Sequence, residues 1–112
     1  MKNASLALLI TTFSTLSFAA DVWHTSTIRS VYPLANGSFV LTFTTETENC
    51  TNGNKPRYFY VGQGLNGVTA DGANKIYSLA LAAASQKLPL VIAFDNSTSD
   101  CAINRASVQF SN

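Results

Sequence analysis

The sequence predicts one small domain that is mainly β-sheet with a single helix. Three observations support this prediction. Short segments rich in β-branched and aromatic residues recur along the chain, separated by turn-forming residues. One alanine-rich segment, Ala73 to Gln86, has the apolar period of an amphipathic helix. Two cysteines, Cys50 and Cys101, are far apart in the chain, as the partners of a single stabilising disulfide are.

The first 19 residues have the composition of a secretory signal peptide. Lys2 supplies a positive charge, and an uncharged, mostly apolar run extends from Ala4 to Leu16. Ser17 and Ala19 place small residues at the −3 and −1 positions of a cleavage site. A membrane anchor is the alternative, but the run is shorter than the about 20 residues that span a bilayer. We therefore expect residues 1–19 to be removed and the mature protein to be secreted or periplasmic.

Residues 20–112 are then long enough for one domain and not for two. The chain has seven Lys and Arg against six Asp and Glu, so without Lys2 the mature protein is formally neutral. It has no basic run of the kind that binds nucleic acid backbones or anionic lipids. We expect no nucleic acid partner and no membrane insertion, and the overall charge favours a neutral or polar ligand.

Three strands are predicted in the first part of the mature chain. The first covers Asp21 to Tyr32, and Asn36-Gly37 after it is the strongest short signal for a hairpin turn. Ser38 to Thr45 forms the second strand, in which apolar residues alternate. Arg57 to Val61 forms the third strand after a polar, turn-rich segment.

A helix and two further strands follow a glycine-rich loop. Thr69 or Asp71 is the predicted N-cap of the helix, whose body is Ala73 to Gln86. Leu90 to Phe94 is wholly apolar, as expected of a strand that is buried or paired on both sides. Ile103 to Phe110 is the predicted last strand.

This order, five strands with the helix between strands 3 and 4, is that of the OB-fold, a five-stranded Greek-key barrel. A plain antiparallel sheet with one packed helix is the alternative. In either case the helix covers an otherwise open apolar surface. Its apolar residues fill an arc of roughly 200°, wider than the about 100° that packing on one sheet requires. The surplus predicts a second buried surface, such as another subunit, although most of the surplus is alanine, which tolerates exposure.

No catalytic, cofactor-binding or metal-binding motif is recognisable. His24 is the only histidine, so no second imidazole is available for a metal or a proton relay. The two cysteines lack CxxC spacing, and residues 95–100 lack the glycine and glutamate of a calcium loop. The sequence therefore predicts no catalytic residue, no metal and no cofactor, and we expect that the protein is not an enzyme.

Aromatic residues are the best candidates for ligand contacts. Trp23, Tyr32, Tyr58 and Tyr60 have amphipathic rings, which suit stacking on a sugar or packing in an interface. Tyr58 and Tyr60 are expected on the face opposite Phe59. Trp23, Tyr58 and Tyr60 are the predicted ligand-binding residues, and the alternative role is cross-strand stabilisation of the sheet.

The segment ANKIYSLALAAASQKLPLVIAFD, Ala73 to Asp95, resembles the B subunits of pentameric bacterial toxins of the subtilase-cytotoxin and pertussis-like group. The strand order extends the likeness over most of the mature chain. The resemblance implies an OB-fold, a homo-oligomer through the helix at Ala73 to Gln86, and binding of host glycans. The cysteine positions differ from the family's, and no sugar-contacting residue of the family has a match here.

Together these features predict an exported, non-enzymatic binding module that recognises a glycan or a protein and assembles as an oligomeric subunit. The alternative is a monomeric structural or envelope-stress protein of the periplasm. The two differ in whether the alanine-rich helix is covered by another copy of the chain.

Overall fold

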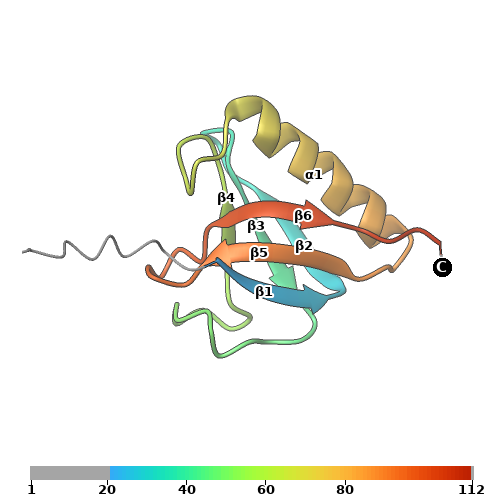
Figure 1. Ribbon diagram of the computed structural model, residues 1–112, viewed down its shortest axis with the longest axis horizontal. Coiled ribbons are helices and arrows are strands. Elements are labelled where there is room, and N and C mark those ends of the chain that lie inside the picture. Colours follow the sequence, from blue (N-terminus) through green and yellow to red (C-terminus); the bar gives the residue numbers. More distant parts are fainter. Residues whose placement is uncertain (1–20, 112) are drawn as a thin grey trace, which may run out of the picture.

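The computed structural model describes residues 21–111, so the predicted signal peptide, residues 1–19, lies outside the described residues. The chain is mainly β-sheet with one helix, as predicted (Figure 1). Its elements in chain order are β1 (Asp21–Ser26), β2 (Ile28–Pro33), β3 (Phe39–Phe43), β4 (Phe59–Val61), α1 (Ala70–Ser85), β5 (Leu90–Asp95) and β6 (Ile103–Ser107).

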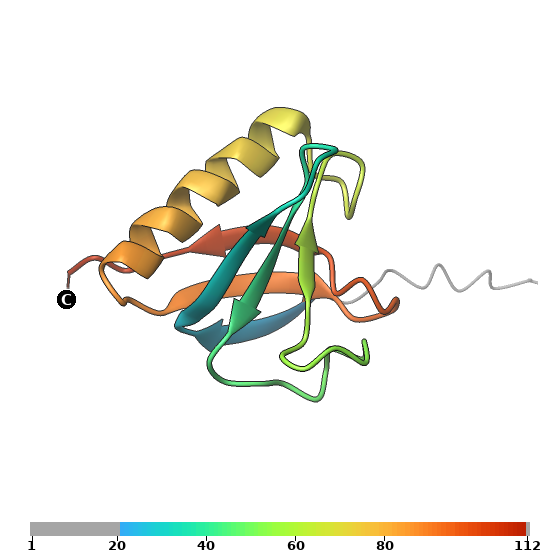
Figure 2. The ribbon, with the colours of Figure 1, turned by 180° about the vertical axis from the view of Figure 1, so that it is seen from behind.

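The strands form two antiparallel sheets of three strands each. One has the order β1-β5-β6 and the other the order β2-β3-β4. Figure 2 shows that the strands of the two sheets cross at a large angle, while α1 lies along one side, next to β2 and β6. The apolar strand Leu90–Asp95 is central in its sheet, as its composition predicts.

The prediction of five strands is wrong in number, because the first predicted strand is divided at Thr27. Asp21–Ser26 pairs with β5 in one sheet, whereas Ile28–Pro33 pairs with β3 in the other. The chain thus passes from sheet to sheet within one residue. Accordingly α1 lies between the fourth and fifth strands, not between the third and fourth. Inward-facing residues continue to alternate through Ser26 and Ile28, so the sequence pattern does not mark the change of sheet.

The last predicted strand is too long. β6 ends at Ser107, whose partner Val91 is the second residue of β5, so only Leu90 of β5 remains for the chain beyond Ser107. Phe110 is consequently 54% exposed and does not belong to the core.

The core between the sheets is built on aromatic rings. Phe59 of β4 packs edge-on against Phe43 of β3 and against Phe94 of β5, with ring centroids 5.1 and 5.0 Å apart. All three rings are fully buried. Such pairs contribute about 0.5–1.5 kcal/mol each beyond the burial of their area. The Phe59 ring therefore links the two sheets.

Helix α1 begins at Ala70 because Thr69 caps it. The Thr69 hydroxyl oxygen accepts a hydrogen bond from the backbone N–H of Gly72 at 2.9 Å, which confirms one of the two predicted caps. The residues of α1 that are buried against the sheets are Ala73, Ile76, Ala80 and Ala83. Three of them are alanines, whose small side chains allow the helix to lie close to the strands. Leu81, by contrast, is 44% exposed.

The predicted disulfide between Cys50 and Cys101 is present and fully buried. It joins the loop after β3 to Cys101, which lies two residues before β6. The bridge therefore connects the two sheets at one end of the domain. Because its partners are 51 residues apart in sequence, the bridge closes more than half of the described chain into a loop.

We expect the double variant Cys50→Ser/Cys101→Ser to be less stable by about 4 kcal/mol, since the long closed loop restricts the unfolded chain. Urea unfolding followed by Trp23 fluorescence measures the difference, and reduction of the parent with dithiothreitol is the matched comparison. An unfolding midpoint equal to that of the oxidised parent would contradict this account of the bridge.

Candidate functional site

Three tyrosines lie together on the outer face of sheet β2-β3-β4. Tyr32 and Tyr60 flank Val40 in the strand register, and the ring centroids of Tyr32 and Tyr58, and of Tyr58 and Tyr60, are each 6.2 Å apart. The rings cover Val40, which is only 1% exposed although it points away from the core. Tyr32 itself is 52% exposed. We call Tyr32, Tyr58 and Tyr60 the tyrosine face.

Hydroxyl groups continue this surface along the strands. The hydroxyls of Ser30 and Thr42, a cross-strand pair of β2 and β3, are hydrogen-bonded to each other. Farther along, the hydroxyls of Thr27 and Thr44 are 2.6 Å apart. The outer face thus combines exposed aromatic rings with polar groups beside them, the combination expected where a ligand has both apolar and hydroxyl-bearing surfaces.

A cleft of about 360 Å³ opens at the end of this surface. It lies where the bulged start of β2 meets the residues after β3 and those before β4. Its lining residues are Arg29, Phe43, Thr44, Glu46, Lys55, Pro56 and Arg57. Three of these side chains are cationic and one is a carboxylate, so we call it the basic cleft.

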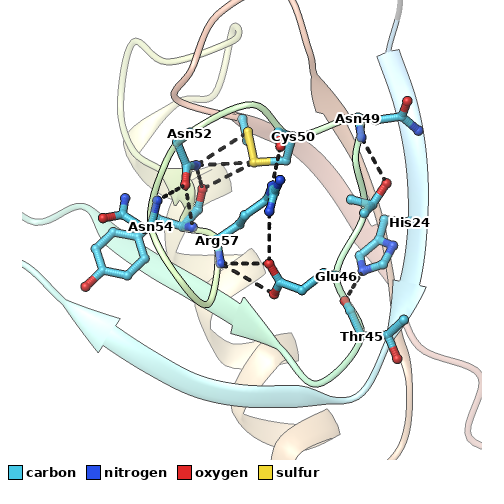
Figure 3. Close-up of polar contacts among 11 residues, drawn as sticks. His24, Thr45, Glu46, Asn49, Cys50, Asn52, Asn54 and Arg57 are labelled. Atoms are coloured by element: carbon cyan, nitrogen blue, oxygen red, sulfur yellow. Dashed lines mark hydrogen bonds and ion pairs between the residues drawn. A yellow bond between two sulfur atoms is a disulfide. The ribbon is translucent and has the colours of Figure 1, made fainter.

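Arg57 is held in place within the basic cleft (Figure 3). Its Nε donates a hydrogen bond to the carbonyl oxygen of Cys50, and its Nη1 lies 3.4 Å from Oε2 of Glu46. The backbone N–H of Arg57 donates to the same carboxylate at 3.1 Å. Glu46 therefore binds both the backbone and the guanidinium of Arg57, and the loop between β3 and β4 is closed upon itself.

Asn52 fixes the backbone of Tyr58. Its Nδ2 donates to the carbonyl oxygen of Tyr58 at 2.6 Å, and its Oδ1 accepts from the N–H of Tyr58 at 3.2 Å. The same Nδ2 lies 3.2 Å from Sγ of Cys50, so the amide is wedged against the disulfide (Figure 3). One side chain thus replaces the strand pairing that Tyr58 lacks and sets where its ring is placed.

The third predicted ligand residue, Trp23, lies elsewhere. It belongs to β1 in the other sheet, is 56% exposed, and has the guanidinium carbon of Arg105 at 4.9 Å from its ring centroid. Arg105 also lies 3.7 Å from the carboxylate of Asp21. The structure therefore groups Tyr58 and Tyr60 with Tyr32 and not with Trp23. Tyr32 could have been found from the hairpin: pairing across the Asn36-Gly37 turn puts it opposite Val40.

His24 is part of the core. Its ring stacks on Phe59 with centroids 6.0 Å apart, meets the edge of Phe43 at 5.4 Å, and has Nε2 2.9 Å from the carbonyl oxygen of Thr45. These contacts anchor the start of the loop between β3 and β4 (Figure 3). Among the residues that the structure describes, no three His, Cys, Asp or Glu side chains gather closely enough to hold a metal ion.

No family model, curated protein or solved structure matches this chain. The resemblance to toxin B subunits therefore stays a prediction. Within residues 21–111, no helix has both the length and the apolar character needed to cross a membrane.

We expect Asn52→Ala to lower the free energy of unfolding by about 1–3 kcal/mol, because it leaves the N–H and carbonyl of Tyr58 without their partners. Chemical denaturation provides the measurement. The matched control is Asn54→Ala, since Asn54 is exposed and its side chain makes no hydrogen bond within the described chain. Equal destabilisation by both substitutions would show that the Asn52–Tyr58 contact is not what holds this loop.

Proposed function

We propose that this protein is an exported, non-enzymatic binding module that recognises carbohydrate through the tyrosine face. The contiguous rings of Tyr32, Tyr58 and Tyr60 on an exposed sheet surface are the observation on which the proposal rests. Aromatic rings with a polar end stack on the apolar faces of sugars while their hydroxyls meet the sugar hydroxyls. The exposed hydroxyl of Ser30, which is hydrogen-bonded to the buried Thr42, supplies a further polar partner.

We also propose that the two sheets close into an OB-like Greek-key barrel, in which β1 and β2 together act as one bent strand. Two features support this. Only Thr27 separates β1 from β2, so the sheets are joined through one nearly continuous strand. On the opposite side, the N–H of Tyr60 in β4 donates to the carbonyl oxygen of Asp100 at 3.3 Å, just before β6. In an OB-fold the faces of the second and third strands are a common binding surface, and here they correspond to β3 and β4.

The carbohydrate hypothesis is tested with residues 20–112 on a glycan array, followed by calorimetry with the glycan that binds best. We expect Tyr60→Ala to weaken binding about fivefold or more, as truncation of an interface aromatic does. Tyr60→Phe keeps the ring and should lose less. Trp23→Ala, an exposed aromatic of the other sheet, is the matched control and should bind like the parent.

Two outcomes would refute the hypothesis. One is a folded parent protein that binds no glycan on the array. The other is a glycan whose affinity falls equally with Tyr60→Ala and with Trp23→Ala, since a site on the tyrosine face cannot depend equally on a side chain of the other sheet.

The third part of the proposal is that copies of the chain associate through α1. Leu81 lies on its outer surface, 44% exposed, and is the large apolar residue of the predicted arc that the sheets leave uncovered. Full burial of an exposed leucine contributes about 1.5–3 kcal/mol, so covering the exposed part of Leu81 with a partner helix would contribute somewhat less than half of that.

We expect light scattering to find the mature protein as an oligomer, and Leu81→Lys to shift it to monomer without loss of fold. Gln86→Lys, at the exposed C-cap residue of α1, should leave the oligomer intact. A parent that remains monomeric at high concentration would instead favour the alternative, a monomeric structural or envelope-stress protein of the periplasm.

A further inference from the structure

We propose that the basic cleft binds an oxyanion, a carboxylate or sulfate group, so that the carbohydrate recognised by this protein is an acidic one. This inference rests on the proposed function, since it names the class of ligand that the tyrosine face and the basic cleft together would select. The near-zero net charge of the whole chain favours a neutral ligand, but the uneven distribution of its charged side chains favours an acidic one.

Cationic groups are concentrated in the basic cleft. Half of the six Lys and Arg side chains beyond Lys2 line it, as Arg29, Lys55 and Arg57, against the single carboxylate of Glu46. Elsewhere Lys75 and Arg105 pair with Asp71 and Asp21 at 3.1 and 3.7 Å. Within residues 21–111, neither Arg29 nor Lys55 is within ion-pair distance of a carboxylate. The cleft therefore holds a local excess of positive charge that no side chain around it neutralises.

A β-bulge accounts for the position of Arg29. Ile28 pairs with Phe43 and Ser30 pairs with Thr42, although these two partners are adjacent in β3, so Arg29 is an extra residue in β2. A bulge re-aims side chains relative to regular alternation. It allows Ile28 to pack against the core while Arg29 lines the cleft.

Arg57 is oriented before any ligand arrives. A guanidinium has five N–H donors, of which Nε is used by the Cys50 carbonyl and Nη1 by Glu46. Within residues 21–111 the remaining donors have no partner, so they can form the paired hydrogen bonds that arginine makes with carboxylate and sulfate oxygens. Because the side chain is already ordered, little conformational entropy is lost on binding.

The basic cleft and the tyrosine face belong to one surface. Arg57 precedes Tyr58 in the chain, and Thr44 of the cleft follows Val40, the residue of β3 between Tyr32 and Tyr60, by four positions, about 13 Å along an extended strand. A ligand longer than about 13 Å can therefore place an apolar ring face on the tyrosines and an anionic group in the cleft.

The cleft is tested first without any carbohydrate, by titrating sodium sulfate into isotopically labelled protein of residues 20–112 at constant ionic strength. We expect amide chemical-shift changes centred on Arg29, Thr44 and Arg57. Arg29→Ala and Lys55→Ala should each weaken sulfate binding about fivefold, the effect of one charge at contact distance in water. Lys87→Ala, which removes a cation outside the cleft, should change nothing. Shifts spread evenly over the surface, or equal effects of all three substitutions, would overturn the proposal.

The acidic ligand is tested on a glycan array that carries neutral, uronate-bearing and sulfated glycans. We expect the parent to prefer one of the two acidic groups, which also identifies the oxyanion. Arg29→Ala/Lys55→Ala should abolish that preference, whereas Tyr60→Ala should weaken binding to all glycans. Raising the salt from about 0.01 M to about 0.15 M shortens the Debye length from about 30 Å to about 8 Å and should reduce the preference.

The two proposals fail in different ways. If neutral and acidic glycans bind the parent equally, and do so through Tyr60, the proposal of an acidic ligand is wrong and the proposed carbohydrate-binding function stands. If sulfate binds in the cleft but no glycan binds, the function is wrong. If neither sulfate nor any glycan binds, both are wrong.

Discussion

The ring of Phe59 lies between the two sheets, edge-on to Phe43 on one side and to Phe94 on the other, with His24 stacked on its face. These contacts define the geometry of the domain, because β4 is short and its few backbone pairs with β3 would hold it only weakly on their own. Because Phe59 faces inward, its neighbours Tyr58 and Tyr60 must face outward. The buried aromatic cluster therefore positions the exposed one, and the tyrosine face follows from the packing of the core.

The loop between β3 and β4 adds charged residues to the candidate site. It contains no strand or helix, yet the side chains of Glu46 and Asn52 hold the backbone of Arg57 and Tyr58 in place. Asn52 forms hydrogen bonds with Tyr58 in place of strand pairing, and Glu46 forms an ion pair with Arg57. The Cys50–Cys101 disulfide links the loop to the other sheet. An irregular segment held in this manner presents charged groups in fixed positions without the regular alternation that a strand would impose.

Much of the fold follows from local patterns in the sequence. The cap at Thr69, the Asn36-Gly37 hairpin and the outward alternation of Tyr58 and Tyr60 depend on neighbouring residues only. The division of the first strand at Thr27 does not, because residues on both sides continue to alternate and only pairing with distant strands distinguishes them. The basic cleft was also beyond prediction, since Arg29, Glu46 and Arg57 come from separate segments and depend on a bulge that no local signal marks.

The bulge at Arg29 also has an evolutionary consequence. The extra residue has no cross-strand partner, and its side chain belongs to neither the core nor the ladder of β2 and β3. Substitutions at this position are therefore under little constraint from folding. A descendant of this chain can remove the charge of Arg29 from the cleft in one mutational step while keeping the same domain beneath it, so the ligand preference that we propose for the cleft can diverge faster than the architecture.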